Sequence, residues 1–572
     1  MSLIKTPHAA VIVWNYDDRI SSIGFAYDSR DVDADRYPGI EVAVDETIIS
    51  TISLISISTN KTKSSPVGTF NLVLAPTRNW TATLTPGSWC AILMSNEAIT
   101  KKSLEEAKAT QLKMIGRIDA VRTNVSVDDS GARSTTYSVQ GRDWGSIFEN
   151  TLYVDPMIQD PKDDKSGQAS AAYQLIINDC LDSNGNPNQQ NVKTNITTVL
   201  SVLGEPLNVG DTSRLFKVTH EVTLPQELVN FLYQQGSSQT PVNFMKLLNV
   251  ITGPLKTEGE DDYDQSDPDI TGLAVLTPSS LIGQHSLWSV IQEHSNYALN
   301  ETFPEMRWTP DSVVPEFRLY CRIKPFSYRD TPVSVETDGI DRASTEMRSM
   351  FQNIASHYLD TEAVMNVNVG VNWADKINFL EIKPDYNDSV SSQLTQNKSQ
   401  AFQGNNDGSY VYSREGFRPI IFSIRQLPFL PDRSEPDFSL LEKWALLAQE
   451  WYFDCHRFLN GTVVLYGSDE YVPVGDNIIF DAELIGVTRN HNNKAKDEDA
   501  IFVLAHVESV QNNFSVSSDG ARSFQTTINF VRGILINEHK QLIGSGTIDN
   551  LASTLSKEDS KNSATVFSSE EE

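Results

Sequence analysis

The chain has 572 residues, and at about 150 residues per domain this length predicts three or four domains. Its composition is that of a soluble globular protein, with 39% hydrophobic and 21% charged residues, but 75 acidic against 46 basic residues leave a formal net charge of −29. Such a surface repels a phosphate backbone, so the charge argues against a protein that binds nucleic acid through its phosphates. It suits a wall past which DNA moves, but a merely soluble, abundant protein would have the same charge.

Cysteine usage and hydropathy bear on where the protein is made. Cys90, Cys180, Cys321 and Cys455 stand far apart without a CxxC spacing, which predicts reduced thiols in a cytoplasmically made protein rather than a disulfide framework or zinc site. The apolar run from Ala9 to Trp14 is too short for a signal peptide, and no stretch approaches the roughly 18 apolar residues that span a bilayer. We therefore expect no direct membrane insertion.

From about residue 11 to residue 139 the patterns favour strands. Phe70, Leu72 and Leu74 alternate with polar or smaller neighbours, and a second alternating run follows the turn at Gly87. In "TISLISIS", residues 51–58, the alternation changes phase, which predicts a β-bulge that bends the strand.

Between about residue 151 and residue 437 the pattern is mixed. Helices are expected over residues 172–179, over residues 227–233 after Pro225, after Ser286 as N-cap, and from Ser439, whose capping box with Glu442 opens the longest apolar stripe. Polar stretches at 182–193, 258–269 and 387–409 indicate exposed loops or arms ordered by a partner. Residues 541–572, rich in Ser, Lys and Glu, predict a disordered tail.

One segment of the sequence occurs twice, 389 positions apart. "SVDDSGARSTTYSV" (126–139) and "SVSSDGARSFQTTI" (515–528) align without a gap from Ile118 and Val507 onward, each as an alternating run, a Gly turn and a second alternating run. A second landmark lies 44 positions before Gly131, at Gly87, and 45 positions before Gly520, at Gly475. This matching spacing predicts a duplicated domain, and the alternative is two unrelated hairpins that share Gly turns.

Motifs for catalysis are missing from the sequence. It contains no HExxH, no GxSxG, no Walker lysine loop and no dinucleotide fingerprint after a strand. The acidic stretch 258–269 lacks the central Gly and closing Glu of a calcium loop. Glu301 and Glu305 could serve as acid and base in glycoside hydrolysis only if they flank a sugar cleft. We expect no enzyme activity, no cofactor and no metal.

Several stretches, in order, resemble the baseplate hub (tail tube initiator) proteins of contractile-tailed bacteriophages. They are "GTFNLVLAP" (68–76), "LTPGSWCAILMS" (84–95), the 115–151 segment around the first repeat, "VPVGDNIIF" (472–480) and the closing 506–533 segment. The middle of the chain resembles the same family at eight landmarks: Trp288, Asn296, Asn300, Glu301, Phe303, Arg322, Pro325 and Phe326. Neither a spike of short glycine-punctuated strands nor a lysozyme-like segment follows, unlike fused hub-spike proteins.

The resemblance implies a β-rich α+β multidomain chain with two similar tube-like β-barrels, one near each terminus, separated by a mixed α/β insertion. We expect the first barrel in 1–150, the insertion in 151–436, a helix and the second barrel in 437–540, and the tail in 541–572. The residues that the two copies share are the candidates for a barrel–barrel interface or repeat motif: Gly87, Gly131, Arg133, Gly475, Gly520 and Arg522.

The family's function implies a structural virion protein. It would be a homotrimeric baseplate hub, located in the virion tail and assembled in the host cytoplasm, that adapts the sixfold tail tube to the threefold central spike. Its partners would be the spike, the tail tube protein, baseplate wedge proteins and the tape measure protein in the lumen, with DNA only as passing cargo. The alternative is a baseplate carbohydrate-binding adhesin or a cell-wall hydrolase.

Overall fold

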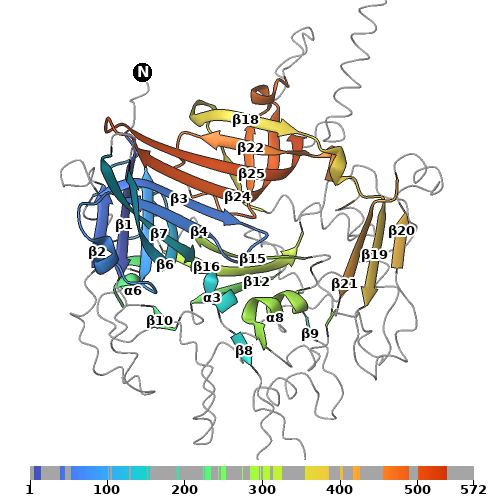
Figure 1. Cartoon of the computed structure of the whole chain (residues 1–572). Helices are drawn as coiled ribbons and strands as arrows, with labels where there is room; N and C mark the ends of the chain where they lie inside the picture. Colours follow the sequence, from blue (N-terminus) through green and yellow to red (C-terminus); the bar gives the residue numbers. More distant parts are fainter. Residues whose placement is uncertain are drawn as a thin grey trace, which may run out of the picture.

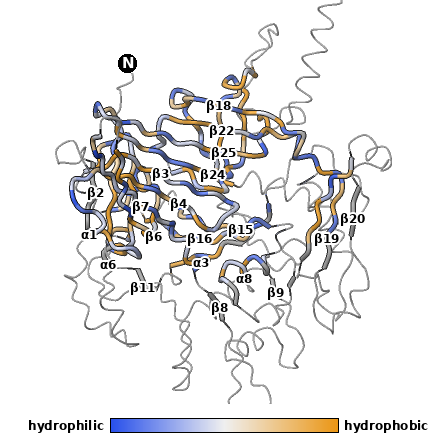
Figure 2. Tube along the Cα trace, viewed as in Figure 1, coloured by the Kyte–Doolittle hydropathy of each residue, from blue (hydrophilic) through white to orange (hydrophobic). Residues whose placement is uncertain are grey.

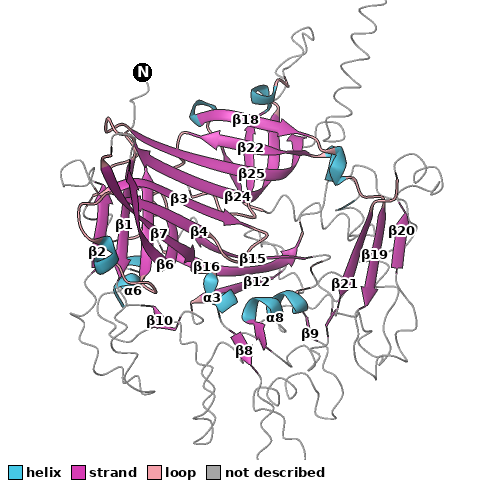
Figure 3. Cartoon of the chain, viewed as in Figure 1, coloured by secondary structure: helices cyan, strands magenta, loops and turns pink. Residues whose placement is uncertain are grey.

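The structure is a computed structural model of the whole chain. It describes residues 6–14, 39–44, 53–100, 102, 106–127, 131–150, 152–154, 190–191, 223–224, 226–233, 242–243, 247–252, 273–274, 284–295, 297, 300–308, 314–324, 354–384, 400–403, 416–424, 452, 455–469, 471–487 and 500–536. The helix expected over 172–179, the acidic stretch 258–269, most of the helix expected from Ser439, and the tail 541–572 lie outside these residues. Strands dominate the described part, and helices are few and short (Figure 3).

The N-terminal part of the chain forms an array of antiparallel strands, here called repeat 1. Its order in the sheet is β3-β4-β7-β6-β5-β1-β2. The bounds are β1 His8–Trp14, β2 Gly39–Val44, β3 Leu54–Thr62, β4 Thr69–Leu74, β5 Trp89–Ser95, β6 Leu112–Val127 and β7 Arg133–Asp143, with a short helix α1 Trp80–Thr83 between β4 and β5.

The C-terminal part forms a second array, here called repeat 2, in the order β18-β22-β25-β24-β23-β17. Its strands are β17 Ser356–Tyr358, β18 Val364–Gly370, β22 Leu459–Leu465, β23 Asn477–Asp481, β24 Phe502–Val516 and β25 Arg522–Ile536. Matched strand by strand, this is the order of the first six strands of repeat 1, and β2 has no counterpart among the described strands of repeat 2. The last strand differs, because β17 runs parallel to β23 whereas β1 runs antiparallel to β5.

The two repeats share irregularities as well as strand order. The expected bulge in "TISLISIS" is present between Leu54 and Ser56, and the matching strand β18 has one between Val364 and Asn366. The long hairpins also match: β6 shifts register against β7 after Ile118, and β24 shifts against β25 after the equivalent residue, Val507. Because a bulge bends a strand and raises its local twist, the shared bulges bend equivalent strands of the two repeats at equivalent positions.

The repeats are joined edge to edge. Residues 509–515 of β24 pair antiparallel with residues 56–62 of β3, so one 13-stranded sheet runs through both repeats (Figure 1). Phe514 and Phe524 of the β24–β25 hairpin are buried in the core of repeat 1 together with Ile57, Phe70 and Leu72. Hydrophobic and hydrophilic positions alternate along many of these strands (Figure 2), as expected of sheets with one face on a core.

A three-stranded sheet, here called the middle sheet, packs against both repeats. Its strand order is β12 (Leu248–Thr252), β16 (Pro315–Ile323) and β15 (Asn300–Trp308). Its core is shared with helices α3 (Ser146–Asn150), α6 (Gln226–Tyr233) and α8 (Leu287–His294). The expectation for α8 is confirmed: the Ser286 hydroxyl accepts from Ser289 N at 3.1 Å and caps the helix.

The remaining described elements are short. Small antiparallel pairs join β8 (Leu152–Val154) to β14 (Gln284–Ser286), β9 (Gln190–Asn191) to β13 (Leu273–Ala274) and β10 (Thr223–Leu224) to β11 (Val242–Asn243). A separate sheet has the order β20 (Gln400–Gln403), β19 (Phe379–Pro384) and β21 (Pro419–Ile424). Short 3₁₀ turns occur at Thr361–Ala363, Trp373–Asp375, Cys455–Arg457 and Ala482–Ile485. No helix in the described part is long and apolar enough to cross a membrane.

Candidate functional site

The glycines shared by the two copies occupy equivalent backbone positions. Gly87 has φ 91° and donates its N–H to the carbonyl of Ile118 at 2.7 Å; Gly475 has φ 81° and donates to the carbonyl of Val507 at 2.9 Å. The acceptors are themselves aligned residues and directly precede the shared bulge. A positive φ strains any residue with a Cβ, so the same turn explains why Gly stands at both positions.

The hairpin turns also match, although their arginines do not share an environment. Gly131 and Gly520 have φ 81° and 84°, and no atom lies within 4 Å of the point that a Cβ would occupy at either residue, so their role is purely conformational. Arg133 begins β7 and is exposed, whereas Arg522 begins β25 and is half-buried. Equivalent barrel–barrel contacts by these two arginines therefore stay a prediction.

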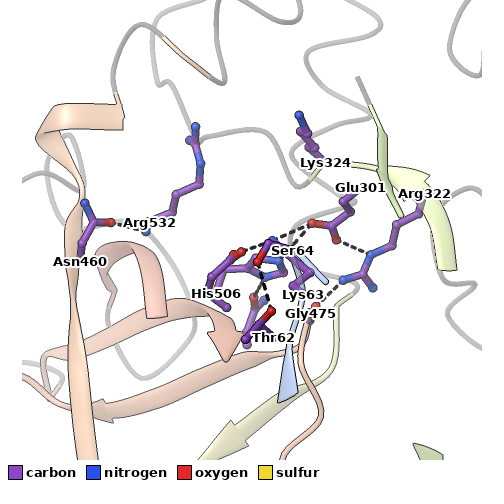
Figure 4. A network of polar contacts seen from close by, with 12 residues as sticks. Thr62, Lys63, Ser64, Glu301, Arg322, Lys324, Asn460, Gly475, His506 and Arg532 are labelled. Atoms are coloured by element: carbon purple, nitrogen blue, oxygen red, sulfur yellow. Dashed lines mark hydrogen bonds and ion pairs between the residues drawn. The ribbon is translucent and has the colours of Figure 1, made fainter. Parts of the chain in front are cut away.

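A buried carboxylate, Glu301 on β15, connects the middle sheet to both repeats (Figure 4). Its Oε1 accepts from Arg322 Nε on β16 at 2.7 Å, and its Oε2 accepts from Lys63 Nζ, just after β3, at 3.0 Å. His506 Nε2 of β24 lies 3.4 Å from the same Oε2. We call these four side chains, from repeat 1, the middle sheet and repeat 2, the junction cluster.

The charges in the junction cluster stabilise one another. Burial by itself would raise the pKa of the Glu301 carboxyl, but Lys63, Arg322 and His506 hold it well below its usual range. Burial, assisted by Lys63, lowers the pKa of His506 to about 4, so this ring is neutral at pH 7. A buried ion pair is costly to break because the remaining charge stays desolvated. The cluster therefore holds the three parts in one arrangement.

Arg322 reaches further into repeat 2. Its Nη2 donates to the carbonyl of Gly475, the shared turn glycine. Its guanidinium lies 5.4 Å from the ring centroid of Phe303 and 5.1 Å from that of Tyr320, and those two rings stack at 5.1 Å. A Cβ on Gly475 would lie 2.2 Å from Cζ of Phe303. The turn of repeat 2 is thus packed directly against the middle sheet.

A second buried pair joins the same elements. Arg307 Nη2 of β15 donates to Asp476 Oδ2 at 2.6 Å, and its Nη1 donates to the Tyr320 hydroxyl at 2.8 Å. His357 Nε2, on β17, lies 2.9 Å from the same Asp476 oxygen. Asp476 is only 1% exposed. Since β17 runs parallel to its neighbour where β1 runs antiparallel, this pair anchors a strand whose direction is specific to repeat 2.

Glu305, the second carboxylate considered for hydrolysis, is enclosed. Its oxygens accept from the Tyr471 hydroxyl and from the backbone N–H groups of Met306 at 2.9 Å and Val474 at 3.2 Å. Burial raises the pKa of Glu305 to about 7. The carboxyl borders a cavity of about 20 Å³ between the repeats, lined also by Lys61 and Asn512. That volume holds about one water molecule.

This geometry does not favour the sugar-cleaving arrangement. Glu301 and Glu305 lie four residues apart on one strand, which separates their Cα atoms by roughly 13 Å at about 3.3 Å per residue. Two carboxyls in glycoside hydrolysis stand roughly 5 to 10 Å apart across a sugar. Every oxygen of both groups already has a protein partner, and a cavity of about 20 Å³ has no room for a sugar ring.

The described part of the chain holds few other groups suited to catalysis or metal binding. Cys90, Cys321 and Cys455 are free thiols, as their spacing predicts, and Cys180 lies outside the described residues. Burial raises the pKa of the Cys321 thiol to about 12, so it is not a reactive thiolate. Within the described ranges, no three His, Cys, Asp or Glu side chains gather as a metal site would require.

The sequence pointed to only part of the junction cluster. Glu301 and Arg322 stand out solely as landmarks of the family resemblance, and no motif includes Lys63 or His506. One signal was available: His506 directly precedes Val507, the first aligned residue of the second copy. A histidine and a lysine on strands more than 400 positions apart carry no local pattern that would associate them.

Solved structures similar to this chain include tail proteins and a Francisella complex. No family model matches the chain, and no curated protein matches it. Among solved structures it is similar to the tail protein from Neisseria meningitidis MC58, at 10% identity and TM-score 0.38 over 91% of this chain and 96% of that one. It is also similar to the 43 kDa tail protein of prophage MuSo2 from Shewanella oneidensis, at 9% identity and TM-score 0.35 over 84% and 94%. A third similar structure is the lidded Francisella PdpA-VgrG complex, at 7% identity and TM-score 0.35 over 93% of this chain and 53% of that one.

Proposed function

We propose that this chain is a structural protein of a phage tail, a homotrimeric baseplate hub whose two repeats are tube-like barrels. The observation that carries the proposal is the edge-to-edge pairing of two equivalent repeats within one chain, through residues 509–515 and 56–62. Pairing between unlike surfaces of equivalent units is head-to-tail and closes into a ring when the rotation allows. A chain with two such units makes a sixfold ring from three copies.

The hub would act as a symmetry adapter. Six similar barrels offer the tail tube a sixfold face, while the insertion between the repeats, present three times, offers the central spike a threefold one. Wedge proteins would bind the periphery, and the tape measure protein and then DNA would occupy the lumen. The formal charge of −29 suits a channel wall, because it does not retain DNA. Such a protein belongs in the virion tail baseplate, is assembled in the host cytoplasm, and has no enzyme activity, cofactor or membrane insertion.

Electron-microscopic class averaging of the purified protein, alone and mixed with the candidate spike protein, tests the proposal. We expect a ring with three outer lobes and six inner densities, and a solution mass of three 63.7 kDa chains. Monomers in both samples would contradict the hub and favour the adhesin. Release of soluble fragments from peptidoglycan would instead identify the cell-wall hydrolase, against which the enclosed Glu305 argues.

A further inference from the structure

Two strand edges of the large sheet carry exposed apolar side chains. β6 pairs with β5 only through residues 112–117, so from Ala120 to Val127 its one strand partner in the described part is β7. β18 ends the sheet, and β22 is its one strand partner among the described residues (Figure 1). Val125 and Val127 on the first edge are each 61% exposed, and Met365 and Val371 on or just after the second are 39% and 49% exposed.

These two edges are the equivalents of the two strands that join the repeats inside the chain. β6 of repeat 1 corresponds to β24 of repeat 2, since Val121 aligns with Val510 and both strands share the bulge. β18 corresponds to β3, since the shared bulge and the pairing to β22 or β4 place Val367 at the position of Ile57. Within one chain β24 pairs with β3, whereas the equivalent strands β6 and β18 do not pair with each other in the described part.

We propose that β18 of one copy pairs antiparallel with residues 120–126 of β6 in the next copy. This deepens the trimeric ring proposed above and rests on it. The internal register places Phe514 opposite Ile57 and Val510 opposite Lys61. Transferred to the equivalent strands, it places Val125 opposite Val367, Thr123 opposite Val369, and Val121 opposite Val371.

At this register the apolar side chains of both strands lie on one face of the sheet and the polar ones on the other. Residues directly opposite each other share a face of the sheet, so one face of the joined edges carries only Val and Thr: Val121, Thr123, Val125, Val367, Val369 and Val371. The other face carries polar residues and glycine: Arg122, Asn124, Ser126, Asn366, Asn368 and Gly370. A slip of one residue would set valines against asparagines, so the pattern selects this register over its neighbours.

The pairing also continues both hydrophobic cores. Val121 packs against the core of repeat 1, and Val367 and Val369 pack against that of repeat 2. Inside the chain, Phe514 of β24 is 1% exposed because it covers the core of repeat 1 beside Ile57. Val125 holds the equivalent place but is 61% exposed, so in the ring it would cover the repeat 2 core of the neighbouring copy.

Ring closure follows from the count of edges. Each copy has one β6 edge and one β18 edge, and these are unlike surfaces, so the contact is head-to-tail and leaves neither of these two edges unpaired in a closed ring. Long unpaired edges invite uncontrolled pairing with other chains. Closing the ring removes both of them from every copy at once.

Paired cysteines test the register in the full-length protein. Opposite Cα atoms in antiparallel strands stand about 4.5 to 5.5 Å apart, which a disulfide spans. The double variants Val125→Cys/Val367→Cys and Asn124→Cys/Asn368→Cys cover both alternating types of pair, because adjacent pairs in an antiparallel ladder differ in type. The slipped control is Val125→Cys/Asn368→Cys, and each single variant controls for the native thiols. After mild oxidation, denaturing electrophoresis should show covalent trimers for at least one matched pair and none for the controls.

The outcomes separate the two proposals. Oxidised trimers from a matched pair alone support the β18–β6 contact. Trimers by solution mass that do not cross-link in either matched pair, or that cross-link equally in the slipped control, overturn this contact and leave the hub standing. Monomers by solution mass overturn both.

Discussion

Glu301 and Arg322 face each other across β15 and β16, and the Nε atom of Arg322 lies 2.7 Å from Oε1 of Glu301. Their side chains are 5% and 4% exposed, so water does not screen the pair. Because the same carboxylate also binds Lys63 from repeat 1 and lies beside His506 from repeat 2, this pair is the point at which three parts of the chain meet.

Arg322→Met should destabilise the protein by about 3 to 5 kcal/mol, because it leaves a buried carboxylate with one charged partner fewer. The free energy of unfolding from urea denaturation measures the loss. Arg142→Met is the matched control, since the Arg142–Asp119 pair is 33% and 39% exposed and should contribute less than about 1 kcal/mol. Equal effects of the two substitutions would contradict the importance of the junction cluster.

Glu305→Gln should change how stability depends on pH. The pKa of Glu305 is raised from 4.5 to about 7, so the folded protein keeps a proton that the unfolded chain loses in this window. The stability that this carboxyl contributes is complete below pH 4.5 and is lost as pH rises through 7. Relative to wild type, Glu305→Gln should therefore gain about 3 kcal/mol of unfolding free energy between pH 4.5 and pH 7.5.

His506→Gln provides the opposite sign. The pKa of His506 is lowered from 6.5 to about 4, so between these pH values the unfolded chain binds a proton that the folded protein does not bind. The stability that the neutral ring contributes is present above pH 6.5 and is lost as pH falls through 4. The unfolding free energy of His506→Gln should therefore rise relative to that of wild type by about 3 kcal/mol as pH falls from 6.5 to below 4. Parallel pH profiles for wild type and both variants, measured by denaturant unfolding, would contradict these assignments.

Gly475→Ala should cost about 2 to 4 kcal/mol, from the strain of a positive φ together with the overlap between the new Cβ and Phe303. Gly520→Ala has a similar φ of 84° but open space, and it should cost only about 1 kcal/mol. Thermal and denaturant unfolding of the two variants compares them directly. A Gly475→Ala protein no less stable than Gly520→Ala would mean that the turn does not pack as described.

Val125→Lys should weaken the trimer without unfolding the single chain. The side chain is 61% exposed within one chain, so the unfolding free energy of the monomer should change by no more than about 0.5 kcal/mol. In the ring, however, the charge would enter an apolar stripe, and sedimentation should show the trimer dissociating at a concentration at least about tenfold higher. Asn124→Lys, on the polar face of the same strand, should leave the trimer intact. If Val125→Lys sedimented like the wild-type protein, this apolar stripe would not be part of the contact between copies.

Local features of the fold were predictable from the sequence. The phase change in "TISLISIS" predicted the bulge after Leu54, Ser286 was recognised as an N-cap, and the expected helix over residues 227–233 is α6 at Gln226–Tyr233. Each of these depends on a few neighbouring residues and on backbone geometry that no distant contact overrides. The assignment of β-strand to repeat residues such as Val139 and Ile528 depended on alternation in the same way.

The sequence by itself determined that one segment occurs twice, with Gly87 and Gly131 spaced as Gly475 and Gly520 are, because turns and alternating strands are local properties of the backbone. Only the tertiary structure decided that β24 pairs with β3, that β17 runs parallel where β1 runs antiparallel, and that Lys63 and His506 meet at Glu301. Strand edges offer the same backbone donors and acceptors to any partner. The choice of partner strand therefore depends on which apolar faces are buried together and which charges are compensated. Those quantities exist only once segments hundreds of positions apart lie against one another.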